Sequence, residues 1–348
     1  MLLTLGKQHQ VNYKYVLKIT KSSNKIIYVS IISKMFYKLV IDRNTPHLSF
    51  AYLFTFFNPV DIKKLVGKYA RPTLLSSHNT VYSKHQHVLY IQSYAGKLTL
   101  TNWISKNVPN TTLGKKQFNH KLLVVIFQVM FTLAVVQEKI PSFRHNDLHT
   151  GNVILLNCTP PDDTGTKQYL SYYCGGYYYN VEFNYIQPTL IDFDLSTISK
   201  KDAGEYTQVV NDDAYDSKYG KLRSNRTLQE KNMYIDINKF SNSLRNIFNK
   251  FKDSTVIESG IWDVLNDICP PDYQFGFDES KKWYGSYAGY KEPWQLSNKS
   301  YGNRYILPHR KPDEFTTPSQ VLMHKSFERF RVEVDDNLIM KKFNYPAV

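Results

Sequence analysis

Cysteine is scarce in this chain, and so are the other features that would place it outside the cell or in a membrane. Three cysteines in 348 residues cannot build a disulfide framework, so we expect a reducing, intracellular compartment. The longest apolar stretch, residues 122–136, is shorter than the roughly 20 residues that span a bilayer, and we interpret it as a buried helix. The opening MLLTLGKQHQ has an apolar run too short for a signal-peptide core. The sequence therefore favours a soluble protein without a membrane partner, and does not choose between cytoplasm and nucleus.

Acidic residues are outnumbered by basic ones. The 44 Lys and Arg against 30 Asp and Glu give a net charge of +14, which favours nucleotide phosphates, nucleic acid or an acidic protein as partners. Nucleic acid is the least favoured of these, because the lysine pairs at 281–282 and 341–342 are isolated and no zinc-finger or RNA-binding signature accompanies them. Cys158 and Cys174 have neither a CxxC motif nor a neighbouring histidine, so we expect no zinc site there.

Hydrophobic patterning predicts few strands at the front of the chain and many helices behind them. Alternating and β-branched runs predict strands at 13–20, 48–57, 87–92, 177–185 and 188–193. Helical spacing predicts helices at 26–41, 100–105, 118–137, 234–251 and 318–331. Polar or Pro- and Gly-rich composition predicts loops at 157–176, 200–231 and 270–316. This order of elements is typical of an α+β protein.

The most informative segment is FRHNDLHTGNVILL, at 143–156. It contains His145-x-Asp147-x-x-x-x-Asn152 followed by an apolar run, and 40 residues after Asn152 the segment TLIDFDLS carries Asp192. Metal-assisted phosphoryl transfer requires a carboxylate that orients the nucleophilic hydroxyl and hard oxygen ligands for Mg²⁺. Asp147 suits the first task, and Asn152 and Asp192 suit the second.

These segments resemble two motifs of the protein kinase superfamily. His145 to Asn152 has the spacing of the catalytic loop H-R-D-L-x-x-x-N, and Asp192-Phe193-Asp194 resembles the metal-binding D-F-G. The form D-L-H-x-G-N is closer to haspin-like atypical kinases and to serine/threonine kinases of large DNA viruses. Those families also resemble this chain in the apolar helix before the loop, the long insertion before the metal aspartate and the missing A-P-E motif. The segment at 233–237 resembles their helix whose buried aspartate, here Asp236, braces the loop backbone.

The resemblance implies a bilobal, protein-kinase-like α+β fold. Residues 1–92 would form a reduced, β-rich N-terminal lobe, and residues 93–348 a larger helical C-terminal lobe with an insertion at about 157–188. ATP would bind between the lobes.

The resemblance also assigns the catalytic positions. Asp147 would orient the acceptor hydroxyl, with His145 as the first residue of the motif. His149 stands where the catalytic loop normally has a lysine that touches the transferred phosphate, and an imidazole could donate a hydrogen bond there.

The remaining positions would bind ATP and magnesium. Lys18 in YVLKI resembles the strand lysine that holds the α- and β-phosphates. Gln92 and Tyr94 lie in the candidate hinge, whose backbone would pair with adenine. Asn152 and Asp192 would hold Mg²⁺.

The front of the chain departs from the family pattern. No G-x-G-x-x-G precedes Lys18, where Gly6 is the only glycine, and Ser33 lies roughly where the partner glutamate is expected. We therefore expect the front lobe to be either truncated or degenerate.

Three functions follow, and the sequence favours the first. The first hypothesis is an ATP- and Mg²⁺-dependent protein kinase of the serine/threonine type. An acidic or phosphorylated substrate would suit the positive charge of the chain. The second is a small-molecule phosphotransferase of the aminoglycoside or choline kinase type, and the third a pseudokinase scaffold. The oligomeric state is not indicated.

Overall fold

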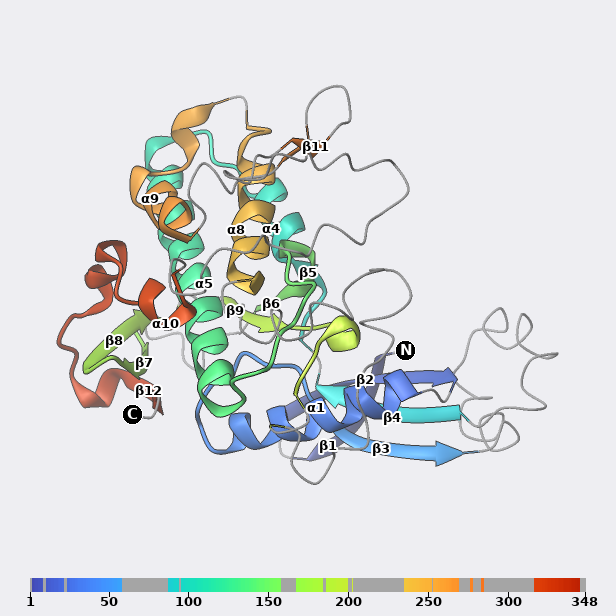
Figure 1. The fold of residues 1–348 in the computed structure, drawn as a ribbon. Coiled ribbons are helices and arrows are strands. Elements are labelled where there is room, and N and C mark those ends of the chain that lie inside the picture. The colour runs from blue at the N-terminus through green and yellow to red at the C-terminus, as the bar shows by residue number, and fades with distance from the viewer. Residues whose placement is uncertain are drawn as a thin grey trace.

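The computed structural model describes thirteen ranges of the chain. They are residues 2–8, 11–21, 24–57, 87–93, 95–157, 167–183, 186–199, 202, 235–251, 253–268, 276–277, 283–284 and 316–344. The molecule combines helices with mainly antiparallel strands, with one sheet in the N-terminal part and most helices in the rest (Figure 1), so the α+β prediction is confirmed.

The N-terminal part is a four-stranded antiparallel sheet with one helix. Its strands follow the order β1 (Leu2–Gln8), β2 (Val11–Lys21), β4 (His87–Ser93) and β3 (Ala51–Phe57). Helix α1 (Asn24–Ile41) connects β2 to this sheet's far edge and contacts β3. The predicted strands and helix of this part are confirmed, whereas β1 was not predicted.

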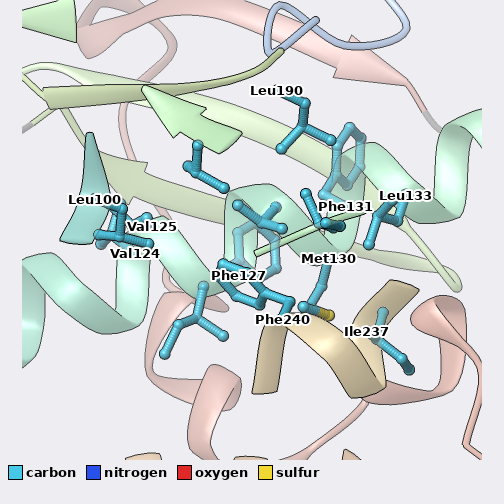
Figure 2. Packing of buried hydrophobic residues seen from close by; sticks show 14 of the residues in the cluster. Leu100, Val124, Val125, Phe127, Met130, Phe131, Leu133, Leu190, Ile237 and Phe240 are labelled. Carbon is cyan, nitrogen blue, oxygen red and sulfur yellow. The ribbon is translucent and has the colours of Figure 1, made fainter. Parts of the chain in front are cut away.

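A long apolar helix forms the centre of the C-terminal part. Helix α5 (Thr112–Lys139) is the one helix in the described ranges long and apolar enough to cross a membrane, but 89% of its apolar window is buried inside the protein. The expectation of a buried helix at 122–136 is confirmed. Figure 2 shows Phe127, Met130 and Phe131 of α5 packed near Ile237 and Phe240 of a second helix.

Further helices surround α5. Helix α4 (Leu100–Lys106) begins at Thr99, whose side chain accepts a hydrogen bond from the Asn102 amide. Helices α8 (Ile235–Phe248) and α9 (Ser259–Ile268) contact each other. The predicted helices in this region are confirmed, and α9 was missed.

A small antiparallel sheet places two turns at one end of a strand pair. Its order is β5 (Leu98–Thr99), β6 (Val153–Asn157) and β9 (Ile186–Leu190). Val153 pairs with Leu190, so the turn before β6 and the turn after β9 meet at the same end. These turns are the 3₁₀ helices η1 (Thr150–Asn152) and η2 (Phe193–Leu195).

The expected loop at 157–176 is wrong over its last part. Residues Tyr169–Cys174 form strand β7, which pairs with β8 (Tyr177–Glu182) and, in parallel, with β12 (Ile339–Asn344). Gly175 and Gly176 both have positive φ (58° and 82°), as a tight hairpin requires. The glycines and tyrosines that suggested a loop are instead a turn and the strands beside it.

The C-terminal helix expected at 318–331 is split. A capping box of Thr317 and Gln320 starts α10 (Pro318–Val321), and a separate 3₁₀ helix, η9 (Lys325–Phe330), begins after His324. The shorter elements are η5 (Ser254–Val256), β10 (Gly276–Phe277), β11 (Trp283–Tyr284) and η10 (Asp336–Leu338). The loops expected at 200–231 and 270–316 lie almost wholly outside the described residues.

Candidate active site

A buried aspartate holds the start of the loop that carries the His145–Asn152 motif. Asp236, in the first turn of α8, is fully buried, and its carboxylate accepts hydrogen bonds from the backbone N–H of His145 (2.8 Å) and of Asn146 (2.9 Å). Hydrogen bonds to an ionised acceptor are stronger than neutral ones, and two of them fix consecutive peptide groups. The contact that the resemblance predicted for Asp236 is therefore present.

The same face of α8 holds the loop at two more points. Lys239 donates from Nζ to the Asn146 carbonyl oxygen. Ser243 Oγ accepts from the Thr150 backbone N–H (3.1 Å) and bonds the Thr150 hydroxyl (2.8 Å). Residues 236, 239 and 243 share one helix face by their spacing. Lys239 and Ser243 were missed by sequence reasoning, although polar residues at this spacing among buried apolar ones were a usable signal.

Asp147 and Asn152 lie against each other inside the loop. Asn152 Nδ2 donates to the Asp147 backbone oxygen (2.9 Å), and Nδ2 lies 3.5 Å from the Asp147 carboxylate oxygen Oδ2. The Asn152 side-chain oxygen therefore points away from this contact. Asp147 keeps 30% of its side chain exposed, whereas Asn152 is buried.

Asp192 reaches the same place from strand β9. The Ile191 backbone N–H donates to the Asn152 carbonyl (3.1 Å), and His145 Nε2 lies 2.9 Å from the Ile191 carbonyl. Asp192 itself is exposed and has φ 64°, a left-handed conformation that costs most residues about 1 kcal/mol or more and that Asp tolerates better than most. The backbone of Ile191 is thus bonded to both His145 and Asn152, which places Asp192, the next residue, beside the loop that carries them.

An aromatic contact connects this site to the N-terminal part. The Phe193 ring lies 4.7 Å from Phe36 of α1 and 5.1 Å from the His145 imidazole, measured between ring centroids. Phe36 also packs edge-on against Phe143 at 5.3 Å. The position of α1 is therefore coupled by packing to the loop and to the turn that follows Asp192.

His149 is exposed and turned back onto its own loop. Its Nδ1 accepts from the Gly151 backbone N–H (3.0 Å), so the neutral ring carries its proton on Nε2, 3.7 Å from the Asp147 Oδ2. Partial burial lowers the pKa of His149, and this outweighs the opposing effect of Asp147; Lys239 lowers the pKa further. The imidazole is therefore neutral at pH 7 and presents a hydrogen-bond donor beside Asp147.

The remaining predicted positions lie in the N-terminal sheet. Lys18 is in β2, opposite Tyr90 of β4, and Gln92 is in β4, but the placement of these two side chains lies outside what the structure describes. Tyr94 lies outside the described residues altogether. Ser33 of α1 accepts a hydrogen bond from the Ala51 amide, so it ties α1 to the start of β3.

No protein-family model matches the chain. Two proteins of Acanthamoeba polyphaga mimivirus, both named "Putative serine/threonine-protein kinase", are similar to it. One is 28% identical over 280 residues, covering 75% of this chain and 55% of that protein. The other is 25% identical over 235 residues, covering 66% and 52%. The chain thus spans about half the length of these curated relatives.

A solved structure of the Rad53 kinase domain and SCD2 in complex with AMPPNP aligns over 96% of this chain and 93% of that one. The TM-score is 0.36 and the identity 7%, values too low to establish a shared fold. The sequence similarity to the viral proteins supports the resemblance to the protein kinase superfamily, while the haspin-like character stays a prediction.

Proposed function

We propose that this chain is a protein kinase of the serine/threonine type that transfers the γ-phosphate of ATP to a protein hydroxyl. The observation that carries the proposal is that Asp236 binds the backbone of His145 and Asn146. Beside it, Asn152 contacts Asp147 through its side chain, and its carbonyl accepts from the amide of Ile191, the residue before Asp192. The similarity to two proteins named as serine/threonine kinases supports the same reaction.

Asp147 is the residue proposed to act on the acceptor. Its partly exposed carboxylate orients the substrate hydroxyl and takes its proton while the new O–P bond forms and the bond from the γ-phosphorus to the bridging oxygen breaks. His149 donates from Nε2 toward the transferred phosphoryl group or toward Asp147, since Nδ1 is occupied by the Gly151 amide.

The donor set fits a magnesium ion shared with nucleotide phosphates. Bound Mg²⁺ would neutralise charge that develops on the phosphate oxygens. Among the described residues no group of three or more His, Cys, Asp or Glu is placed to hold a metal alone. Mg²⁺ commonly binds through one or two carboxylates together with substrate phosphates, and the amide oxygen of the buried Asn152 and the exposed carboxylate of Asp192 suit that arrangement.

The N-terminal sheet is the proposed cover for ATP. Lys18 lies in the interior of β2, paired with β4, the strand that leads toward the hinge at Gln92 and Tyr94. We assign the α- and β-phosphates to Lys18 and the adenine edge to the hinge backbone. Ser33 lies roughly where the resembled family has the glutamate that pairs with the strand lysine, and its hydroxyl binds the Ala51 amide at the start of β3. The proposed site therefore does not include a lysine–glutamate ion pair.

The decisive experiment compares Asp147→Asn with Glu333→Gln, a charge-matched change at an exposed position of the C-terminal segment. Labelled ATP and Mg²⁺ are supplied with a panel of histone, casein and basic proteins, and label is read in serine and threonine. We expect wild type and Glu333→Gln to label protein, and Asp147→Asn to lose roughly 10²–10⁴-fold in turnover while its Mg-ATP affinity is kept. Unchanged transfer by Asp147→Asn would remove the assigned role.

Two further arms separate the alternatives. Choline and aminoglycosides are offered as acceptors in place of protein, and label in them alone would favour a small-molecule phosphotransferase. A melting-temperature titration with Mg-ATP tests nucleotide binding itself, because a ligand of the folded state must raise the melting temperature. Absence of both a thermal shift and any labelling would favour a scaffold.

A further inference from the structure

The backbone around Asp147 is held from one side by a single helix. In α8, Asp236 binds the amides of His145 and Asn146, Lys239 binds the Asn146 carbonyl, and Ser243 binds the Thr150 amide. Helix α8 therefore binds the loop on both sides of Asp147. Of these contacts, the one from Lys239 lies nearest to Asp147, because the Asn146 carbonyl is bonded directly to the Asp147 nitrogen.

Lys239 acts on the peptide group that Asp147 itself belongs to. The Asn146 carbonyl and the Asp147 N–H are two ends of one rigid peptide plane, so an ammonium bonded to this oxygen fixes the orientation of that plane. Asn146 has φ 62°, in the left-handed region, and its side-chain amide donates to the Leu195 carbonyl and the Thr197 hydroxyl (both 3.0 Å). A residue in this sparsely populated conformation needs its surroundings to hold it there.

The charge of Lys239 also reaches the site. Lys239 lies half-buried in the first two turns of α8, and its positive charge lowers the pKa of the His149 imidazole, which faces the Asp147 carboxylate. The ammonium is thus a cation held next to the loop. The loop itself has His149 at the position where the kinase motif normally has a lysine. Such a cation can hold the carbonyl more firmly than a neutral donor, because a hydrogen bond with an ionised partner is about twice as strong.

We propose that Lys239 is a positioning residue for Asp147: its ammonium locks the Asn146–Asp147 peptide so that the carboxylate faces the acceptor hydroxyl. The inference rests on the kinase activity proposed above. It predicts an effect on turnover rather than on nucleotide affinity, since Lys239 binds the backbone of the loop that carries Asp147.

The test uses Lys239→Met, Lys239→Arg and a matched control, Lys250→Met, which removes an exposed lysine from the turn after the same helix. We expect Lys239→Met to lower kcat by roughly 10- to 100-fold, the scale of a small misplacement of a reacting group, with the KM for ATP within about twofold of wild type. Lys239→Arg should recover most of kcat, and Lys250→Met should match wild type. A kcat for Lys239→Met equal to that of Lys250→Met, or a loss confined to KM, would overturn the inference.

A measurement without turnover keeps the inference separate from the kinase assignment. Amide hydrogen exchange at His145 and Asn146 should be about tenfold faster in Lys239→Met than in Lys250→Met, because the loop opens more readily when one anchor is lost. If wild type transfers no phosphate while exchange shows this difference, the kinase assignment fails and the anchoring by Lys239 stands. Equal exchange in the two variants would refute the anchoring whatever the activity. Should Lys239→Met not fold, Lys239→Gln takes its place in both readings, because it removes the charge and keeps a polar side chain.

Discussion

Two polar networks inside this protein differ in the hydrogen-bond partners of their side chains. The catalytic-loop network consists of His145, Asn146, Asp236 and Lys239, and its side chains bind mainly backbone groups. The Tyr172 network consists of His47, Gln128 and Tyr172, each at most 1% exposed. Its side chains bind one another: Gln128 Nε2 donates to the Tyr172 hydroxyl (2.8 Å), which lies 2.9 Å from His47 Nε2.

The Tyr172 network joins segments that are far apart in the chain, in an apolar surrounding. His47 precedes the bridge between the loop after α1 and β9, Gln128 lies in α5, and Tyr172 lies in β7 with its ring stacked on Phe343 of β12. No carboxylate takes part in the hydrogen bonds described for these three residues. The catalytic-loop network, in contrast, has two solvent-accessible carboxylates next to it, Asp147 and Asp192. We infer that one network stabilises the fold and the other orients reactive groups.

The largest expected effect comes from Asp236→Asn, which keeps the size of the side chain and removes its charge. One amide oxygen cannot replace two carboxylate oxygens toward two N–H donors, so we expect a stability loss of about 3 kcal/mol and at least a 100-fold loss in turnover of the folded enzyme. Urea unfolding and initial rates of phosphate transfer measure the two effects.

The matched control is Ser241→Ala, on the same helix, whose hydroxyl binds the Leu265 carbonyl instead of the loop. It should cost about 1 kcal/mol and leave the turnover of folded protein unchanged. Equal turnover of Asp236→Asn and Ser241→Ala would contradict the inference that the catalytic-loop network orients reactive groups.

The sequence predicted the parts of the site that lie in motifs. Asp147 and Asn152 precede an apolar run and Asp192 follows one, and the resemblance of these segments and of 233–237 to the protein kinase superfamily implied that Asp236 contacts the loop. Lys239 lies beyond the segment 233–237 that carries the resemblance, so only its helical spacing from Asp236 pointed to the loop; its partner, the Asn146 carbonyl, is shown by the packing of α8 against the loop.

The same limit applies to the fold. Strand β7 exists as a strand partly through parallel pairing with β12, about 170 residues later, so local composition suggested a loop. His47 was not singled out because a lone histidine after a helix has no local signal of burial. The ATP-binding assignments of Lys18, Gln92 and Tyr94 stay predictions.

The second expected effect is a pH dependence that belongs to the Tyr172 network. Burial lowers the pKa of His47 to about 3, because a charged imidazole cannot be hydrated there and the Pro188 carbonyl at 2.9 Å offsets this only in part. Nδ1 donates to that carbonyl, so the neutral ring accepts the Tyr172 hydroxyl at Nε2. In the unfolded chain the His47 imidazole binds a proton near pH 6.5, whereas in the folded protein it stays neutral. Its contribution to the free energy of unfolding is therefore fully present above that pH and is lost progressively on acidification.

The free energy of unfolding should fall by about 1.4 kcal/mol for each pH unit below 6.5, which gives about 2 kcal/mol between pH 6.5 and pH 5. Urea unfolding of wild type and of His47→Gln across this range isolates the contribution, since the variant lacks the titrating group. A stability difference between the two proteins that does not change with pH would show that His47 is not held neutral.

The smallest effect expected is that of Tyr172→Phe, and it is also the most selective. Removing the hydroxyl leaves the Gln128 amide and His47 Nε2 without their described partner at the centre of the core, at a cost of about 1–2 kcal/mol. Tyr178→Phe, on the same sheet but 56% exposed, is the control and should stay within about 0.5 kcal/mol. Both variants should keep the wild-type kcat when rates are corrected for the folded fraction. A lower kcat in folded Tyr172→Phe would mean that the two networks are coupled, through the bridge of Leu48 to Leu190 and the turn at Asp192 that follows it.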